Sequence, residues 1–188
     1  KNMNIKLDRL NVQLEELNIK DRSETVFKIM KLKDIEKDAV FAGKKSEVIT
    51  LSKTDINLSS NNARQIFSQV AGLNIYQNDD AGLQLNIGGR GLNPSRTANF
   101  NTRQNGYDIS ADVLGYPESY YTPPSESLDK IQIVRGAAAL QYGTQFGGLI
   151  NFVLKKPNQS KRLSSIIRNT LASNNLFTNY SEFSGKIN

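Results

Sequence analysis

The sequence predicts a small α+β domain that combines a mixed β-sheet with short helices, and three observations carry this prediction. Residues 131–152 read as two short apolar strands joined by a glycine-rich segment with one helical turn. Residues 62–75 read as an amphipathic helix that runs into a strand. Residues 163–171 and 177–187 are long, polar-rich and strand-like, so the end of the chain differs in character from the domain.

The first expected elements of the domain are a strand and a helix. Glu47–Leu51 reads as the first strand. A helix is expected from an N-cap at Ser59 or Ser60 to Val70, with Gly72 ending it. One face of this helix is apolar at helical spacing, formed by Ala63, Ile66, Phe67 and Val70.

The remaining elements are expected to be short strands and turns. Alternating apolar residues predict strands at 73–75 and 83–87, on either side of a turn at 78–82. Asn105-Gly106 predicts a type I′ hairpin within residues 104–109. Helical turns are expected at 125–130, before the strand that begins at Ile131, and at 137–140.

The composition excludes several kinds of chemistry. The 188 residues contain no cysteine and no histidine, which removes disulfides, thiolate or imidazole metal sites and histidine-based catalysis. The net charge is +6, but the basic residues are spread out, so no nucleic-acid partner is expected. No apolar run approaches the roughly 20 residues of a membrane helix. The start at Lys1 lacks an apolar segment, so we expect any export signal to have been removed.

Enzyme motifs are incomplete in this chain. Ser127-Leu-Asp-Lys130 fits a Ser-x-x-Lys pattern, but the companion motifs of that enzyme class are missing. The glycines at 88, 89 and 91 do not complete a dinucleotide-binding motif, and Asp79-Asp80 reads as part of a turn. We therefore expect no enzyme activity, no cofactor and no metal ligands.

Four segments, in order along the chain, resemble parts of one known family. Ile131–Phe152 carries strand, Arg-Gly, short helix, Tyr-Gly, Gly-Gly and strand, and it resembles the C-terminal signature of the plug domain of TonB-dependent outer-membrane receptors. Earlier parts of the same domain are similar to Asn62–Ile75, Gln84–Gly91 and Gln104–Ile109. Three positions depart from the family pattern, where Ala71, Asn105 and Gln132 replace the usual Pro, Asp and Glu.

The resemblance implies a plug that closes a barrel pore and helps to bind a ferric chelate for energy-coupled import. The region around Gly91–Pro94 is most similar to ferric dicitrate receptors. The implied partners are TonB, the ferric chelate, the protein's own barrel domain and the outer membrane. The implied location is the outer membrane, with the N-terminus in the periplasm. The alternative is a stand-alone secreted binding or signalling module that reuses the plug fold.

The resemblance also implies a division of the chain. Residues 1–20 are assigned to the end of an upstream domain, 21–46 to a linker, 47–160 to the plug and 161–188 to the first strands of a transmembrane β-barrel. The pattern of residues 21–46 suits a short helix or a linker lying on the plug. Because 28 residues supply at most two membrane strands, we expect the chain to be a fragment. The tail is expected to be poorly ordered, to pair with a neighbouring chain or to fold back along the plug.

One N-terminal segment resembles a TonB box, which would add a strand to the energy-transducing partner. The alternative is a final strand of the upstream domain. The segment consists of Leu14, Glu15, Glu16, Leu17, Asn18 and Ile19.

The remaining candidate site residues are also implied by the resemblance. Arg90 and Arg135 occupy the family's two Arg-Gly positions and are expected to dock on barrel carboxylates, against the alternative of ordinary exposed arginines. Three loops are expected to form the ligand site, against the alternative of solvated loops. In these loops Arg96 and Arg103 would pair with carboxylates of the chelate. Neutral hydrogen bonds would come from Tyr120, Tyr121, Gln141 and Gln145.

Overall fold

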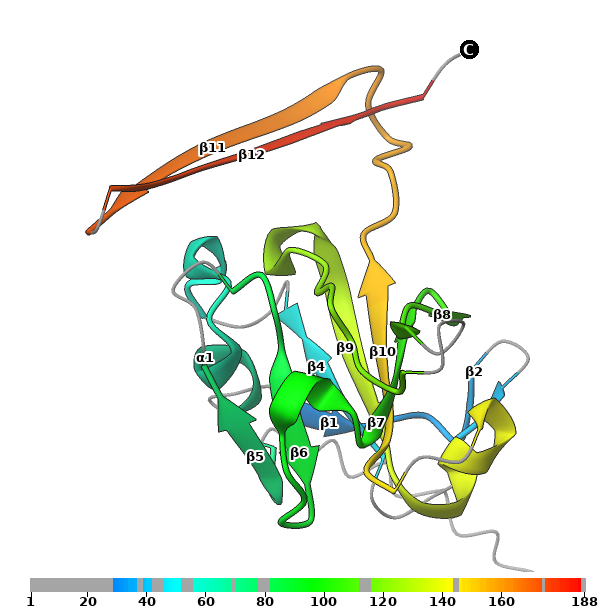
Figure 1. The fold of residues 1–188 in the computed structure, drawn as a ribbon. Coiled ribbons are helices and arrows are strands. Elements are labelled where there is room, and N and C mark those ends of the chain that lie inside the picture. Colours follow the sequence, from blue (N-terminus) through cyan, green and yellow to red (C-terminus); the bar gives the residue numbers. More distant parts are fainter. Residues whose placement is uncertain are drawn as a thin grey trace, which may run out of the picture.

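A six-stranded sheet lies at the centre of the computed structural model, which describes residues 29–36, 39–41, 46–51, 56–68, 70–77, 82–111, 116–143, 146–173 and 175–186 (Figure 1). The strand order is β1-β4-β9-β10-β7-β8. Strands β10 and β7 are parallel, and the other neighbours are antiparallel. The predicted α+β class with a mixed sheet is therefore confirmed. The strands are β1 (Ile29–Lys31), β4 (Glu47–Thr50), β9 (Leu128–Val134), β10 (Gly148–Leu154), β7 (Phe100–Gln104) and β8 (Tyr107–Asp108).

Short helices and three separate strand pairs surround the sheet. The helices are α1 (Ala63–Phe67) and the 3₁₀ helices η2 (Leu58–Ser60), η3 (Ser95–Thr97), η5 (Ser125–Ser127) and η6 (Gly136–Tyr142). The strand pairs are β2 (Ile35–Glu36) with β3 (Ala39–Val40), β5 (Leu73–Tyr76) with β6 (Asn86–Gly89), and β11 (Ser164–Ala172) with β12 (Leu176–Ser184).

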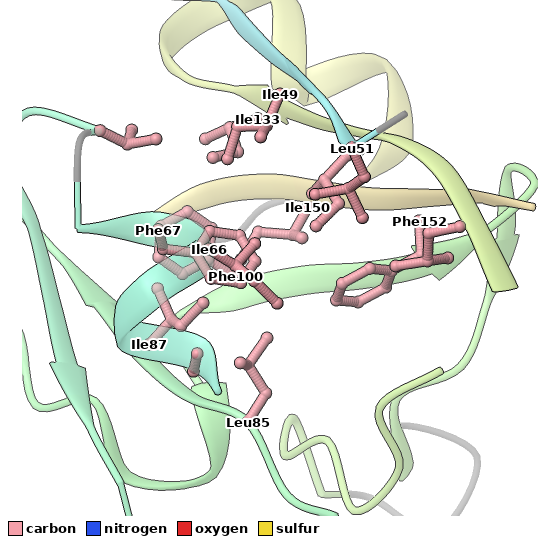
Figure 2. Close-up of a cluster of buried hydrophobic side chains, with 14 residues drawn as sticks. Ile49, Leu51, Ile66, Phe67, Leu85, Ile87, Phe100, Ile133, Ile150 and Phe152 are labelled. Carbon is pink, nitrogen blue, oxygen red and sulfur yellow. The ribbon is translucent and has the colours of Figure 1, made fainter. Parts of the chain in front are cut away.

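The main hydrophobic core lies between one face of the sheet and the layer formed by α1, β5 and β6 (Figure 2). Successive side chains of a strand point to opposite faces, so alternate residues of the central strands reach this core. Helix α1 contributes Ile66 and Phe67, which are 5% and 1% exposed. The sheet contributes Ile49, Ile131, Ile133, Ile150, Phe152 and Phe100.

The opposite face of the sheet carries a small apolar cluster and a row of polar groups. Leu32, Phe41, Val48, Val134 and Leu149 form the cluster. Beside it, Gln132 on β9 donates to Glu36 of β2 at 2.9 Å and accepts from Asn151 of β10 at 2.7 Å. Glu36 also pairs with Lys130. These polar groups connect the β2–β3 pair to the middle of the sheet.

The predicted helix exists but starts later and ends earlier than expected. Asn62, rather than Ser59 or Ser60, caps α1 by accepting from the backbone N–H groups of Arg64 and Gln65. The serines lie in η2, and Asn61 separates the two helices with a φ of 45°. Its left-handed backbone interrupts helical hydrogen bonding. The predicted apolar face is confirmed, because all four of its members are buried.

Two predicted hairpins are present with small differences. The turn at Asn105 and Gly106 has φ values of 51° and 88°, as the predicted type I′ turn requires. Strand β6 begins at Asn86 rather than at Leu83, which is 71% exposed. The intervening Leu85 donates its N–H to the Thr122 hydroxyl instead of to a strand. The turn expected at 78–82 lies mostly outside the described residues.

The stretch before the first expected strand contains strands rather than a helix. Strand β1 pairs antiparallel with β4 and extends the main sheet, and β2 pairs with β3. The helix alternative for this stretch is therefore wrong in its described part. The TonB-box candidate lies outside the described residues.

The tail forms a hairpin in which the nine-residue strands β11 and β12 pair antiparallel over their whole length. It lies apart from the sheet and is joined to β10 by an extended connection (Figure 1). It contacts the domain through a few polar side chains, which agrees best with the expectation that it folds back along the domain. In the described part of the chain, no helix has the length and apolar character needed to cross a bilayer.

Candidate ligand-binding loop and the hairpin contact

Arg96 and Tyr120, two of the predicted ligand-binding residues, lie together. Helix η3 carries Arg96, and its guanidinium lies 5.1 Å from the centre of the Tyr120 ring. The Arg96 guanidinium donates to Glu118 at 3.1 Å and to the Tyr120 hydroxyl at 3.2 Å. The Tyr120 hydroxyl also donates to Glu118. We call Arg96, Glu118 and Tyr120 the arginine cluster.

The arginine cluster is an exposed ion pair rather than a lone cation. The Arg96 and Glu118 side chains are 48% and 26% exposed. The hydrogen bond from Tyr120, together with Arg96, lowers the pKa of Glu118 below its usual value. Glu118 is therefore negatively charged at neutral pH. An anionic ligand that binds Arg96 must share or displace this carboxylate.

The backbone beneath Arg96 is strained. Arg96 and Thr97 have φ values of 49° and 54°, a left-handed conformation that is rare for residues with a side chain. Thr97 is fully buried, and its hydroxyl donates to Leu85 O at 2.6 Å. The same hydroxyl accepts from Ile87 N at 3.2 Å. These bonds fasten η3 to the chain that enters β6.

Arg103 does not join the arginine cluster. It lies in strand β7 rather than in a loop, and its guanidinium is positioned 5.0 Å from the Tyr142 ring centre. It donates to Asn101 and to the carbonyl oxygens of Gly106 and Tyr142, and Asp108 lies 3.7 Å away. Each of the three nitrogens of the Arg103 guanidinium thus donates a hydrogen bond within the domain.

Of the other predicted ligand residues, Gln141 and Tyr121 lie in the described part of the chain, and the hydrogen bonds found for them join groups outside the arginine cluster. Gln141 exchanges two hydrogen bonds with the backbone of Val40 on β3. Tyr121 is 50% exposed and accepts from Ser119 through its carbonyl oxygen. Gln145 lies outside the described residues. Glu118 was not among the predicted site residues, although an acidic residue two positions before Tyr120 could have indicated a partner for an arginine.

The two Arg-Gly arginines lie in different environments. Arg90 is exposed, with a φ of 57°, and makes no side-chain hydrogen bond or ion pair with the described residues. Arg135 is 8% exposed and faces inward. Its guanidinium donates to Ala71 O at 2.7 Å and to Glu47 at 2.6 Å. These two hydrogen bonds brace the domain internally, and the expected docking of Arg135 on barrel carboxylates stays a prediction.

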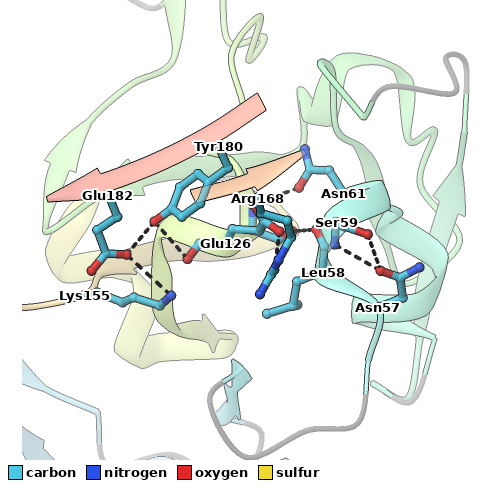
Figure 3. A network of polar contacts seen from close by, with 10 residues as sticks. Asn57, Leu58, Ser59, Asn61, Glu126, Lys155, Arg168, Tyr180 and Glu182 are labelled. Atoms are coloured by element: carbon cyan, nitrogen blue, oxygen red, sulfur yellow. Dashed lines mark hydrogen bonds and ion pairs between the residues drawn. The ribbon is translucent and has the colours of Figure 1, made fainter. Parts of the chain in front are cut away.

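A carboxylate of the domain, rather than an arginine, makes the contact with the tail hairpin (Figure 3). Glu126 of η5 is 7% exposed and pairs with Arg168 of β11. Tyr180 of β12 donates to Glu126 O at 3.3 Å and to Glu182 at 2.7 Å. Lys155 lies 3.8 Å from Glu182. The Glu126–Arg168 pair reverses the charges of the expected docking, whereas the Lys155–Glu182 pair keeps the cation on the domain side.

Within the described ranges, no group of three or more acidic side chains is placed to hold a metal ion. The arginine cluster offers a guanidinium, a carboxylate and a phenol, which suit recognition of a polar, charged molecule.

The fold and the sequence together identify the family. The model of the TonB-dependent receptor plug domain matches residues 43–149, which is more than half of the chain. The chain therefore belongs to the plug domain family of TonB-dependent receptors.

The chain is similar to receptors and transporters of ferric compounds. The ferric enterobactin receptor PirA of Pseudomonas aeruginosa is 28% identical over 120 residues, which cover 57% of this chain and 16% of that protein. The ferric citrate transporter FecA, in its unliganded form, matches with a TM-score of 0.52 and 23% identity, covering 73% of this chain and 25% of that chain. The ferric enterobactin receptor PfeA matches with a TM-score of 0.55 and 20% identity, covering 79% and 23%.

The chain spans a quarter or less of the length of these relatives. The structural matches are less than 25% identical, so they show the fold alone.

Proposed function

We propose that this chain is the plug of a TonB-dependent outer-membrane transporter that closes the barrel pore and helps to bind a ferric chelate for energy-coupled import. The family match over residues 43–149 carries the proposal. The named relatives act on ferric enterobactin or ferric citrate. We propose a ferric dicitrate-like ligand, because the arginine cluster presents a guanidinium suited to carboxylate groups.

The tail hairpin favours the transporter over a stand-alone secreted module. Each of its strands has nine residues, within the roughly 9–11 that a membrane β-strand needs. Arg168, Tyr180 and Glu182 point toward the plug. The opposite face, set by strand alternation, carries exposed apolar side chains at Ile167, Leu171, Phe177 and Phe183. The same face also carries Ser165, Asn169, Asn179 and Ser181, so it is mixed, and the length and full antiparallel pairing of the two strands carry the barrel assignment.

The ligand role of Arg96 gives a prediction for binding. We expect Arg96→Ala in the intact receptor to weaken ferric dicitrate binding about tenfold or more, because hydrogen bonds to charged groups contribute about 1.5–3 kcal/mol. We expect Glu118→Gln to strengthen binding, because it removes the competing carboxylate. Both differences should shrink as salt is raised. Titration of the purified receptor with ferric dicitrate measures them.

Arg64→Ala is the matched control for this prediction, because it removes the same charge from the exposed side of α1. Equal effects of Arg64→Ala and Arg96→Ala would assign the change to net charge. Wild-type affinity in Arg96→Ala would remove the main support for a dicitrate-like ligand.

The proposed TonB box gives a prediction for transport. We expect deletion of residues 14–19 to abolish energy-dependent uptake of labelled ferric dicitrate and to leave its binding at the cell surface intact. The reason is that a TonB box acts by pairing with the energy-transducing partner, not by holding the ligand. Loss of surface binding together with uptake would instead assign the segment to folding.

A further inference from the structure

The arginine cluster is built on a backbone conformation that its own sequence disfavours. Left-handed geometry is unfavourable for each residue that is not glycine, because Cβ approaches the following carbonyl oxygen. Arg96 and Thr97 adopt it consecutively, and Thr97 is β-branched, which makes its positive φ an outlier. Such strain persists only where surrounding contacts hold it in place.

Two buried residues, Asn86 and Ser119, supply those contacts. Asn86 is 1% exposed, and its side-chain oxygen accepts from the N–H of Arg96 at 2.8 Å. The carbonyl of Arg96 accepts from the N–H of Ser119 at 2.8 Å. Ser119 directly follows Glu118, so the bond to Arg96 also places the carboxylate of the cluster. Both polar groups of the Arg96 peptide backbone are therefore fixed, one by β6 and one by the loop that carries Glu118 and Tyr120.

Asn86 and Thr97 are buried, whereas the Arg96 side chain that they support is exposed. A loop that needed only to connect β6 to β7 would relieve the strain with glycine at position 96 or 97. The chain has glycines nearby at positions 88, 89 and 91 but not at these two positions. An arginine in this conformation directs its guanidinium at Glu118 and Tyr120.

We infer that Asn86 and Thr97 are positioning residues that hold Arg96 in the left-handed conformation, so that its guanidinium is presented beside Glu118 as an exchangeable anion-binding group. This inference rests on the proposed function for the identity of the anion, a ferric chelate. The strain itself is a property of the plug alone. Asn86 and Thr97 act through Arg96 and need no contact with the ligand.

The first test measures strain without any ligand. Arg96→Gly and Arg96→Ala both remove the guanidinium, but only glycine relieves the left-handed backbone. We expect the glycine variant of the 188-residue chain to melt about 2–4 °C above the alanine variant, the shift typical of such a stability difference in a chain of this size. Equal melting temperatures would overturn the inference.

The second test measures positioning in the intact receptor, with ferric dicitrate as the probe. We expect Asn86→Ala to lower affinity about tenfold, and Asn86→Asp, which keeps the oxygen that accepts from Arg96 N–H, to retain most of it. In the Arg96→Ala background, Asn86→Ala should cause no further loss, because residues that act through one group are not additive. A further tenfold loss in that background would overturn the positioning role.

The two tests separate the inference from the proposed function. Absence of ferric dicitrate binding by the wild-type receptor would overturn the proposed ligand, while the melting comparison would still report on the strain. Binding with additive losses would keep the ligand and overturn the role of Asn86.

Discussion

Replacement of Gly148 by alanine is expected to unfold the plug. Gly148 begins β10 with a φ of 112°, and an added Cβ would lie 2.3 Å from the carbonyl oxygen of Val134. The obstacle is the backbone of the neighbouring strand β9, which cannot rotate away as a side chain does. We expect a loss of about 4 kcal/mol or more, which is most of the stability of a marginally stable domain. Urea unfolding followed by circular dichroism measures it.

Gly91→Ala is the matched control. Gly91 also has a left-handed φ, 77°, but an added Cβ there would have no atom within 4 Å. We expect a cost of about 1–2 kcal/mol, from the left-handed conformation alone. Equal losses at the two positions would show that the close approach of β9 and β10 does not limit stability.

Removal of the Arg135 guanidinium is expected to have the second-largest effect. Arg135→Met keeps the length of the side chain but leaves Glu47 and the carbonyl of Ala71 without this donor. Breaking a buried ion pair costs about 3–5 kcal/mol, and the partial exposure of Glu47, 26%, reduces the expected loss to about 2–3 kcal/mol. The free energy of unfolding of the 188-residue chain measures this loss.

Arg90→Met tests whether Arg90, unlike Arg135, makes no contribution to the stability of this chain. Arg90 is exposed and makes no side-chain ion pair with the described residues, so its replacement should change the stability of this chain by no more than about 0.5 kcal/mol. We propose that Arg90 docks on the barrel, and on that proposal Arg90→Met affects only the intact receptor. A large loss at Arg90 and none at Arg135 in this chain would reverse the two assignments.

The sequence allowed the core and the central strands to be predicted because their apolar residues recur with the right period. Ile131 and Ile133 alternate on β9, and Ala63, Ile66, Phe67 and Val70 share one face of a helix. The boundaries of α1 were not predictable from the serines, because Asn57 and Asn62 each cap a separate short helix. The alternation of Leu83 with Leu85 predicted a strand that begins too early, because it does not show that the N–H of Leu85 donates to the Thr122 hydroxyl.

The site was less predictable than the fold, because contacts between distant residues decide it. Arg96 and Tyr120 were selected and lie together, while Arg103 was selected from a stretch that proved to be strand β7. Nothing in the residues near Arg135 indicates that Glu47, 88 positions earlier, is its partner. Arginine in an Arg-Gly pair is compatible with both an inward and an outward side chain, and only the folded sheet separates the two.

The strand order has a consequence for how the chain acquires its structure. Strands β9 and β10 occupy the middle of the sheet, yet they are the last of its six strands in the sequence. Strand β4 cannot pair with β9, and the β7–β8 hairpin cannot pair with β10, until residues 128–154 have been synthesised. The parallel register of β7 and β10 then aligns Gly148 with Phe100. Contacts between such distant residues form slowly, since a long loop must close first. The pairs β1–β4 and β7–β8 therefore emerge before the two strands that join them, and assembly of the whole sheet depends on residues 128–154.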